Sequence, residues 1–229
     1  MKICVTFLKT PEIEDYALIA ESNRAAYCKR NGYDARITSG PLDEKRSPHW
    51  STIINVLQIL EEDKYDWVFK TDADALIKNF DIKIENLIDE NYDFVFTKDA
   101  FGAINSGNYL VKNSDSAKSL LRKTLSCKDF EGHPWHEQCG FIETLKNYPS
   151  VKYVPQREFN SYPPESGDSG FIEGKGYAFV ELGLTEGYQF DILKQREGLY
   201  HVGDFLIHMA GIPHEKKIKL MTAYESMLT

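Results

Sequence analysis

The first third of the chain alternates between short apolar segments and longer segments with helical spacing. The apolar segments, each of which predicts a strand, are residues 1–10, 33–38 and 67–71. Between them we expect two amphipathic helices, at residues 11–32 and 50–62. Strands that alternate with helices of this length predict an α/β domain, with a mostly parallel central sheet flanked by helices.

The rest of the chain continues the pattern less regularly. We expect strands at residues 93–97, 108–111, 151–154, 177–180 and 205–208, and helices at residues 114–125, 134–145 and 215–228. Residues 155–176 are rich in Pro, Gly, Ser and Tyr and predict an irregular loop, a type of segment that often binds ligands. At 229 residues, 42% of them hydrophobic, the chain can form one large domain or two closely packed ones.

Asp72 and Asp74 follow the strand pattern at residues 67–71 and precede another apolar segment, residues 75–77. Side chains at positions i and i+2 of an extended segment point the same way, so both carboxylates are expected to converge. Carboxylates rarely lie between two buried segments unless they are paired or bind an ion, and hard cations such as Mg²⁺ and Mn²⁺ prefer oxygen ligands. The pair therefore predicts a metal-dependent enzyme of nucleotide-sugar or phosphate chemistry. The alternative is a chance Asp-x-Asp sequence, because aspartate is frequent in this chain.

His208 ends the strand pattern at residues 205–208 and can complete a metal site with Asp72 and Asp74. After it, Gly211 would let the backbone approach a phosphate, and Lys216 or Lys217 could neutralise that phosphate. The alternative is a histidine packed at a sheet edge, followed by a lysine-rich helix start.

Charge and cysteine content exclude other classes. The net charge of −8 and the pI of about 5.3 argue against a nucleic-acid-binding protein, which usually carries a basic patch. The four cysteines have no metal-binding or paired spacing, and buried free thiols in a reducing compartment are expected. Since no segment approaches the length of a signal-peptide core or a membrane span, we expect a soluble, cytoplasmic chain without a transmembrane segment.

Six blocks in the sequence resemble glycosyltransferase family 34, the galactosyl-, xylosyl- and alpha-mannosyltransferases, and they occur in the family's order. The blocks are residues 23–34 (NRAAYCKRNGYD), 48–52 (PHWST), 66–77 (DWVFKTDADALI), 104–114 (INSGNYLVKNS), 135–138 (WHEQ) and 208–211 (HMAG). The chain departs from the family at Thr52, where a lysine is common, and at Lys70 and Thr71, which replace bulky apolar residues. The glycogenin-like family is similar too, because it shares Asp-x-Asp, Asn-x-Gly and His-x-x-Gly.

The resemblance implies a single GT-A glycosyltransferase domain over residues 1–229, with a nucleotide-binding half at about 1–112 and an acceptor-binding half at about 113–229. It also implies a retaining transfer of a hexose or pentose from a UDP- or GDP-linked donor to a glycan acceptor. Asp72, Asp74 and His208 would hold Mn²⁺ or Mg²⁺. The remaining roles are as follows: Asn105 would orient the donor sugar, Glu137 and Gln138 would serve the acceptor, and Thr6 and Phe7 would line the base pocket, while Gly211, Lys216 and Lys217 would contact the diphosphate.

Two other functions remain open from the sequence. One is a catalytically inactive GT-A-like protein that binds a sugar or a nucleotide, although the intact candidate residues argue against it. The other is a nucleotidyltransferase, a class that generally has a glycine-rich basic loop after its first strand. Residues 6–11 (TFLKTP) contain no glycine.

Overall fold

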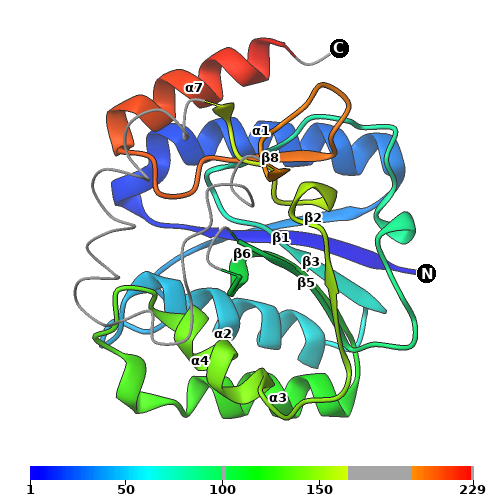
Figure 1. The fold of residues 1–229 in the computed structure, drawn as a ribbon, viewed down its shortest axis with the longest axis vertical. Coiled ribbons are helices and arrows are strands. Elements are labelled where there is room, and N and C mark those ends of the chain that lie inside the picture. Colours follow the sequence, from blue (N-terminus) through cyan, green and yellow to red (C-terminus); the bar gives the residue numbers. More distant parts are fainter. Residues whose placement is uncertain (100–101, 165–196, 228–229) are drawn as a thin grey trace.

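The computed structural model describes residues 1–99, 102–164 and 197–227. Its centre is a six-stranded sheet with helices on both faces (Figure 1). In spatial order the strands are β2 (Asp34–Ser39), β1 (Ile3–Lys9), β3 (Trp67–Lys70), β6 (Ile104–Lys112), β5 (Phe94–Lys98) and β7 (Val151–Val154). All neighbouring pairs are parallel except those that involve β6, which runs antiparallel to β3 and to β5. The sheet is therefore mixed but mostly parallel.

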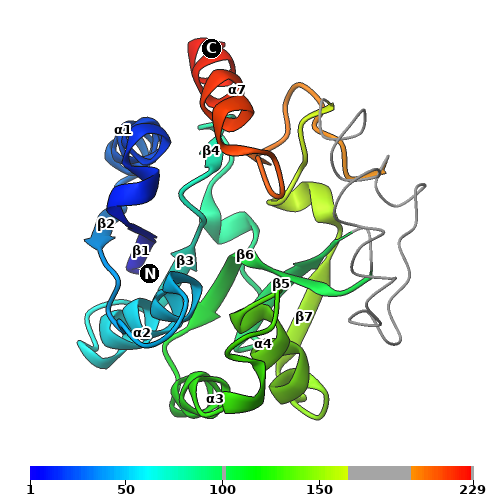
Figure 2. The same cartoon turned by 90° about the vertical axis from the view of Figure 1, so that its left-hand side faces the viewer.

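Helices form a layer on each side of this sheet (Figures 1 and 2). One layer contains α2 (Pro48–Glu61), α3 (Asp115–Leu125) and α4 (Glu137–Leu145), and the other contains α1 (Glu14–Asn31) and α7 (His214–Ser226). A separate two-stranded antiparallel sheet, β4 (Ala75–Ile77) with β8 (Leu206–His208), packs beside α1. Short 3-10 helices occupy Pro11–Ile13, Ile84–Asn86, Lys128–Phe130 and Gln156–Glu158.

Local sequence explains where the helices begin and end. Ser47 caps α2 by accepting a hydrogen bond from the His49 N–H, and Ser114 caps α3 in the same way through the Ala117 N–H. Gly32 ends α1 with φ 76°, a left-handed conformation that glycine adopts without a steric penalty.

The central strands are buried on both faces. In β3, Val68 packs with the cluster formed by α2, α3 and α4, whereas Trp67 and Phe69 pack with the cluster beside α1. Such strands appear as continuous apolar runs, because no face is left for polar residues. Lys70, the last residue of β3, is the exception: it is 1% exposed and charged.

The pairing of β5 with β6 contains an irregularity that shapes the site. Phe96 pairs with Tyr109, but the next residue, Thr97, pairs with Asn105. Residues 106–108 of β6 are thus unpaired with β5, and they lie beyond the end of the β3–β6 pairing at Lys70 and Tyr109. Irregularities of this kind redirect side chains and are frequent next to active sites.

The α/β sheet expected from the sequence is confirmed, with three differences. The strand expected at residues 108–111 begins earlier, at Ile104. The helix expected from residue 134 begins only at Glu137, because residues 133–136 form a turn in which His136 has φ 46°. The antiparallel direction of β6 was not foreseen. The strand expected at residues 177–180, and much of the loop expected at 155–176, lie outside the described residues.

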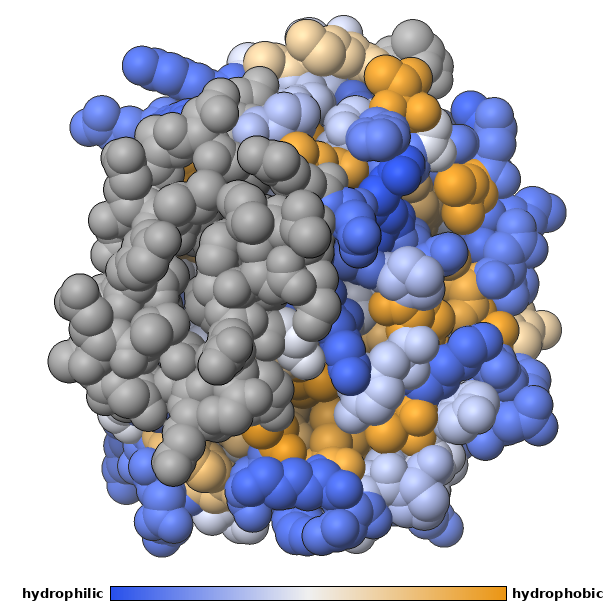
Figure 3. Space-filling model, in the orientation of Figure 1, coloured by the Kyte–Doolittle hydropathy of each residue, from blue (hydrophilic) through white to orange (hydrophobic). Residues whose placement is uncertain are grey.

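On the face drawn in Figure 3, hydrophobic residues outside the grey region occur in small groups bordered by hydrophilic ones. Within residues 1–99, 102–164 and 197–227, no helix combines the length and the apolar character needed to cross a membrane.

Candidate active site

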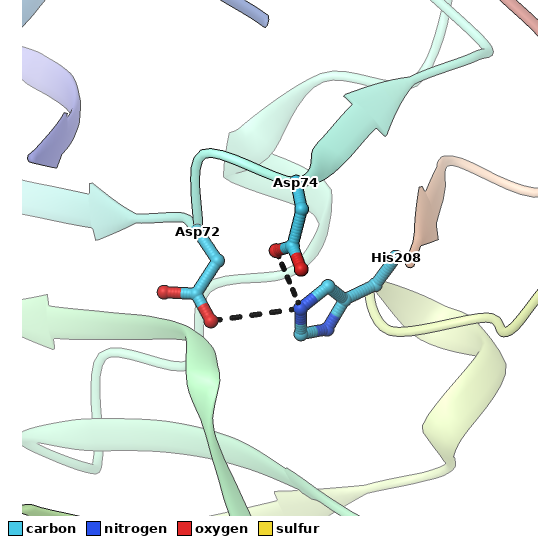
Figure 4. A group of neighbouring side chains, drawn as sticks. All are labelled: Asp72, Asp74 and His208. Carbon is cyan, nitrogen blue, oxygen red and sulfur yellow. Dashed lines mark hydrogen bonds and ion pairs between the residues drawn. The ribbon is translucent and has the colours of Figure 1, made fainter. Parts of the chain in front are cut away.

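Asp72 and Asp74 lie between β3 and β4, in a turn that leads from the central sheet to the small one (Figure 4). The segment is not extended, as the sequence argument assumed. Residues 73 and 74 form a turn, in which the Ala75 N–H donates to the Asp72 carbonyl at 3.3 Å. The two carboxylates nevertheless point to the same region, because the turn redirects Asp74 toward Asp72.

His208 completes this group. Its Nε2 lies 3.1 Å from Asp74 Oδ1 and 3.5 Å from Asp72 Oδ2 (Figure 4). One ligand atom from each of the three residues lies within 4.8 Å of the others. Two carboxylate oxygens and an imidazole nitrogen are suitable donors for Mn²⁺ or Mg²⁺.

Backbone pairing brings His208 to this position. In the small sheet, His208 of β8 pairs with Ala75 of β4, and the Met209 N–H donates to the Asp74 carbonyl at 2.9 Å. The other ring nitrogen, Nδ1, lies 2.7 Å from Asn160 Oδ1. If Nδ1–H donates to that oxygen, the lone pair of Nε2 faces the carboxylates, which is the arrangement that a metal-binding histidine needs.

Two lysines pair with the carboxylate oxygens that face away from His208. Lys70 Nζ lies 2.6 Å from Asp72 Oδ1, and Lys217 Nζ lies 2.6 Å from Asp74 Oδ2. Burial alone would raise the pKa of both carboxyl groups. The ammonium groups and His208 outweigh burial, so the pKa of Asp72 is lowered and that of Asp74 lies well below its ordinary value. Both side chains are thus held as carboxylates.

The same charges act on His208. Burial lowers its pKa, but the carboxylates of Asp74 and Asp72 outweigh burial and raise the pKa to about 9. A histidine must lose this proton to bind a metal, so cation binding at this site is linked to proton release.

Side chains of helix α1 form hydrogen bonds with the backbone of the turn that carries Asp72 and Asp74. The guanidinium of Arg24, which is fully buried, donates to the carbonyls of Ala75 at 2.6 Å and Asp72 at 3.2 Å, and to Thr71 Oγ1. The amide of Asn23 pairs with both backbone groups of Ile77, at 2.9 and 2.8 Å. These contacts fix the backbone that carries the two aspartates.

Gly107 leaves the space in which the three ligand groups meet. A Cβ atom at this position would lie 2.5 Å from His208 Cε1 and 2.7 Å from Asp72 Oδ2. Both distances are too short for any real contact. The donor set and this space together fit a bound divalent cation.

Glu137 and Gln138 begin helix α4. The Ser106 hydroxyl donates to Glu137 Oε1 at 2.8 Å, and the Ser106 N–H donates to Gln138 Oε1 at 3.2 Å. Glu137 is 4% exposed, and burial raises its pKa to about 7 despite the nearby charge of Lys70. Asn105 lies nearby in β6, where its Oδ1 accepts from the Gly107 N–H at 2.9 Å and its Nδ2 donates to the Tyr162 hydroxyl at 3.3 Å.

These groups line one cavity of about 410 Å³, within the usual size range of small-molecule sites. Its lining includes His49 of α2 and His136, whose rings stack with centroids 4.1 Å apart and planes 5° from parallel. The lining residues are His49, Asp72, Asp74, Asp99, Asn105, Ser106, Gly107, Pro134, Trp135, His136, Glu137, Gln138, Tyr162, His208, Ala210, Gly211, Ile212 and Lys217.

Of the residues expected to bind the nucleotide, some line the cavity and others do not. Gly211 lines the cavity with φ 70°, and Lys217 lines it too, whereas Lys216 is half-buried and is not among the lining residues. The side chains of Thr6 and Phe7 are fully buried. The Thr6 hydroxyl already donates to the Arg36 carbonyl and accepts from Asn55, so neither side chain is presented to the cavity.

Several residues of the site were not identified from the sequence. Asn160 and Asn108 contact His208 Nδ1, at 2.7 and 3.2 Å, and Ser106 orients the start of α4. Asn160 lies in a segment expected to be irregular, and no pattern there marks it. Lys70 did carry a signal, since a charged residue that ends an apolar strand needs a buried partner.

Known proteins were compared with this chain. Residues 7–92 match the model of the galactosyl transferase GMA12/MNN10 family. None of the curated proteins that were searched matches the chain. A glycosyltransferase involved in glycosylation of the major capsid of PBCV-1 matches in structure with a TM-score of 0.66 and 18% identity, over 97% of this chain and 100% of the other.

Two further solved structures are similar. The galactosyltransferase LgtC, in complex with donor and acceptor sugar analogues, has a TM-score of 0.56 and 12% identity, over 99% of this chain and 96% of its own. The glycosyltransferase GlyE of Streptococcus pneumoniae TIGR4, in its apo form, has a TM-score of 0.59 and 11% identity, over 99% of this chain and 61% of its own. At these identities the likeness establishes the fold.

The fold, the family match and the acidic cluster together define a glycosyltransferase with a GT-A fold. The resemblance to glycosyltransferase family 34 is confirmed by the match over residues 7–92.

Proposed function

We propose that this glycosyltransferase moves a hexose or pentose from a nucleotide-diphosphate sugar to a glycan acceptor, with retention of anomeric configuration and with Mn²⁺ or Mg²⁺. One observation carries the proposal. Asp72, Asp74 and His208 meet at a single cavity, and Glu137 and Gln138 line the same cavity. A donor diphosphate and an acceptor hydroxyl can therefore meet in one space.

The two aspartates and His208 would hold the cation, which when bound stabilises the negative charge that grows on the leaving diphosphate. Lys217 adds positive charge on the same side, since it lies at the cavity and already contacts Asp74 at 2.6 Å. Gly211 leaves the nearby backbone open for close approach of a phosphate. We propose Mn²⁺ as the first ion to test.

Gln138 is well placed to orient the acceptor. Its Oε1 accepts from the Ser106 N–H, so its amide N–H groups remain to donate to a sugar hydroxyl. Glu137 is buried and bonded to the Ser106 hydroxyl, which favours a positioning role over that of a nucleophile. Retention is proposed from the family resemblance and requires no enzymic general base if the leaving phosphate oxygen takes the acceptor proton.

A transfer assay tests the proposal. The protein is incubated with labelled UDP- and GDP-sugars, oligosaccharide acceptors and Mn²⁺, alongside Asp74→Asn and an excess of EDTA. We expect transfer or donor hydrolysis by the wild type, and loss of both in the variant and in EDTA, with the circular dichroism spectrum of the variant unchanged. Full activity in EDTA would reject the metal-dependent mechanism.

The products separate the remaining possibilities. Binding without turnover would support an inactive sugar- or nucleotide-binding protein, and activation of a sugar 1-phosphate would support a nucleotidyltransferase. The anomeric proton coupling of fresh product reports stereochemistry, and an alpha product from an alpha donor is expected. A beta product would mean inversion, which needs a general base at the acceptor hydroxyl and would make Glu137 the leading candidate.

We also propose a cytoplasmic location, which cell fractionation would test.

A further inference from the structure

Lys70 is a buried lysine whose hydrogen-bonding capacity is fully used inside the protein. Its Nζ lies 2.6 Å from Asp72 Oδ1, 2.9 Å from the Ser106 carbonyl and 3.1 Å from the Gly107 carbonyl. An ammonium group has three N–H donors and no acceptor, so these three bonds satisfy it. With a side chain that is 1% exposed, Lys70 has no donor left for a substrate and acts only through its neighbours.

The neighbours of Lys70 include a candidate cation ligand and the residue that orients the start of α4. Lys70 binds Oδ1 of Asp72, whose other oxygen faces His208 at 3.5 Å. It also binds the carbonyl of Ser106, the residue that orients Glu137 and Gln138. One ammonium therefore connects a candidate cation ligand to the strand that orients the acceptor side.

Both candidate carboxylate ligands are already paired with a lysine before any cation is bound. Lys70 and Lys217 each pair with one of the two aspartates, so these four side chains are neutral together. Among these four side chains and a neutral His208, as a metal ligand must be, a divalent cation bound alone adds two positive charges that none of the five offsets. Such an excess is costly where little water reaches it, and the negative charge of a nucleotide diphosphate removes it.

We propose that Lys70 is a positioning residue: it fixes Asp72 toward the cation, and its charge makes tight cation binding depend on the diphosphate. This inference rests on the proposed metal-dependent function.

Titration of Mn²⁺ followed by electron paramagnetic resonance tests the inference, in the absence and presence of saturating UDP or GDP. In the wild type we expect the diphosphate to tighten Mn²⁺ binding at least about tenfold, within the usual range of coupling between sites. Lys70→Gln removes the charge but keeps two N–H donors, and it should bind Mn²⁺ alone more tightly, with coupling reduced at least about threefold. Lys70→Arg keeps the charge and should retain the coupling.

Lys112→Met is the matched control, since Lys112 also binds a carboxylate and a carbonyl, both of Glu90, but lies outside the cavity. It should leave Mn²⁺ binding and coupling unchanged. Wild-type coupling in Lys70→Gln, or lost coupling in Lys70→Arg, would overturn the role of the charge. Should the variants not fold, coupling below about threefold in the wild type overturns it as well. Absence of any Mn²⁺ binding by the wild type would instead reject the metal site on which the proposed function depends.

Discussion

At the scale of single residues, Gly107 is the position where the smallest change should have the largest effect. Ala at this position would place a methyl group 2.5 Å from His208 Cε1 and 2.7 Å from Asp72 Oδ2, so one or both ligands must move. We expect Gly107→Ala to weaken Mn²⁺ binding at least about tenfold, because metal ligands tolerate only small displacements. Isothermal titration calorimetry would measure this.

Gly132→Ala is a suitable control for that experiment. A Cβ at residue 132 meets no atom within 4 Å, so this variant should bind Mn²⁺ as the wild type does. Equal affinities for Gly107→Ala and Gly132→Ala would mean that the cation does not bind between Asp72 and His208.

The raised pKa of the buried Glu137 carboxyl group should make the stability of the protein depend on pH. Burial raises its pKa from 4.5 to about 7, so its contribution to folding is complete below pH 4.5 and is lost as the pH rises to about 7. The full loss is on the order of 3 kcal/mol. The glutamine in Glu137→Gln cannot ionise, so this variant does not lose that free energy of unfolding. Relative to the wild type, this variant should therefore gain about 2 to 3 kcal/mol of stability between pH 5 and pH 8.

Urea unfolding at both pH values would measure the gain. Glu143→Gln, on the exposed side of the same helix, is the control and should not show it. A difference between Glu137→Gln and the wild type that is the same at pH 5 and pH 8 would place Glu137 in a more solvated position than the one described.

Individual site residues differed in how well the sequence predicted them. Asp72 and Asp74 were identified because they lie between two apolar segments, and His208 because it ends one, where a charge has few other reasons to occur. Asn160 could not be identified, because its partner His208 lies 48 residues away and only the folded chain brings the two together. Thr6 and Phe7 were expected to line a base pocket, but hydrogen bonds and packing turn both side chains into the core.

At the scale of elements, the contact between α1 and the turn at residues 71–75 predicts that Arg24 is needed for the site. Arg24→Met would leave the carbonyls of Asp72 and Ala75 without their buried donor. We expect a loss of about 2 to 4 kcal/mol in unfolding free energy and weaker Mn²⁺ binding, because the turn is no longer fixed. Guanidinium denaturation and Mn²⁺ titration would measure the two effects.

Arg122→Met provides the comparison at the surface. Arg122 pairs with Glu61 in an exposed ion pair, so its loss should change stability by about 0.5 kcal/mol or less. A similarly small effect of Arg24→Met would show that packing alone holds the turn in place.

Helices and strands were predicted best where one face or both faces are apolar. α2 and β3 follow directly from spacing and burial, and Gly32 ended α1 as expected. The start of α4 was wrong because Pro134 suggested a first helical turn, whereas His136 adopts φ 46° and delays the helix to Glu137. The irregular pairing of residues 106–108 left no signal in local spacing, since it depends on contact with β5.

At the scale of the whole molecule, the alternation of strands and helices was enough to predict the α/β sheet, but not the direction of β6. The direction of a strand depends on the connection that precedes it, which spacing does not reveal. The site itself draws on residues from β3, β6, α4, β8 and α7. The sequence could identify candidate residues, but only the topology of the fold shows that they meet at one cavity.

Because the site joins elements from the whole chain, ligand binding there should stabilise the entire fold. A ligand at 100 times its dissociation constant adds about 2.7 kcal/mol to the native state, which for a domain of this size raises the melting temperature by about 5 to 10 °C. We expect this rise with Mn²⁺ plus either UDP or GDP, and the nucleotide that gives it identifies the donor base. EDTA should remove the rise, and Asp74→Asn should not show it. A rise in melting temperature that persists in EDTA and in Asp74→Asn would mean that the nucleotide binds elsewhere, away from Asp72, Asp74 and His208.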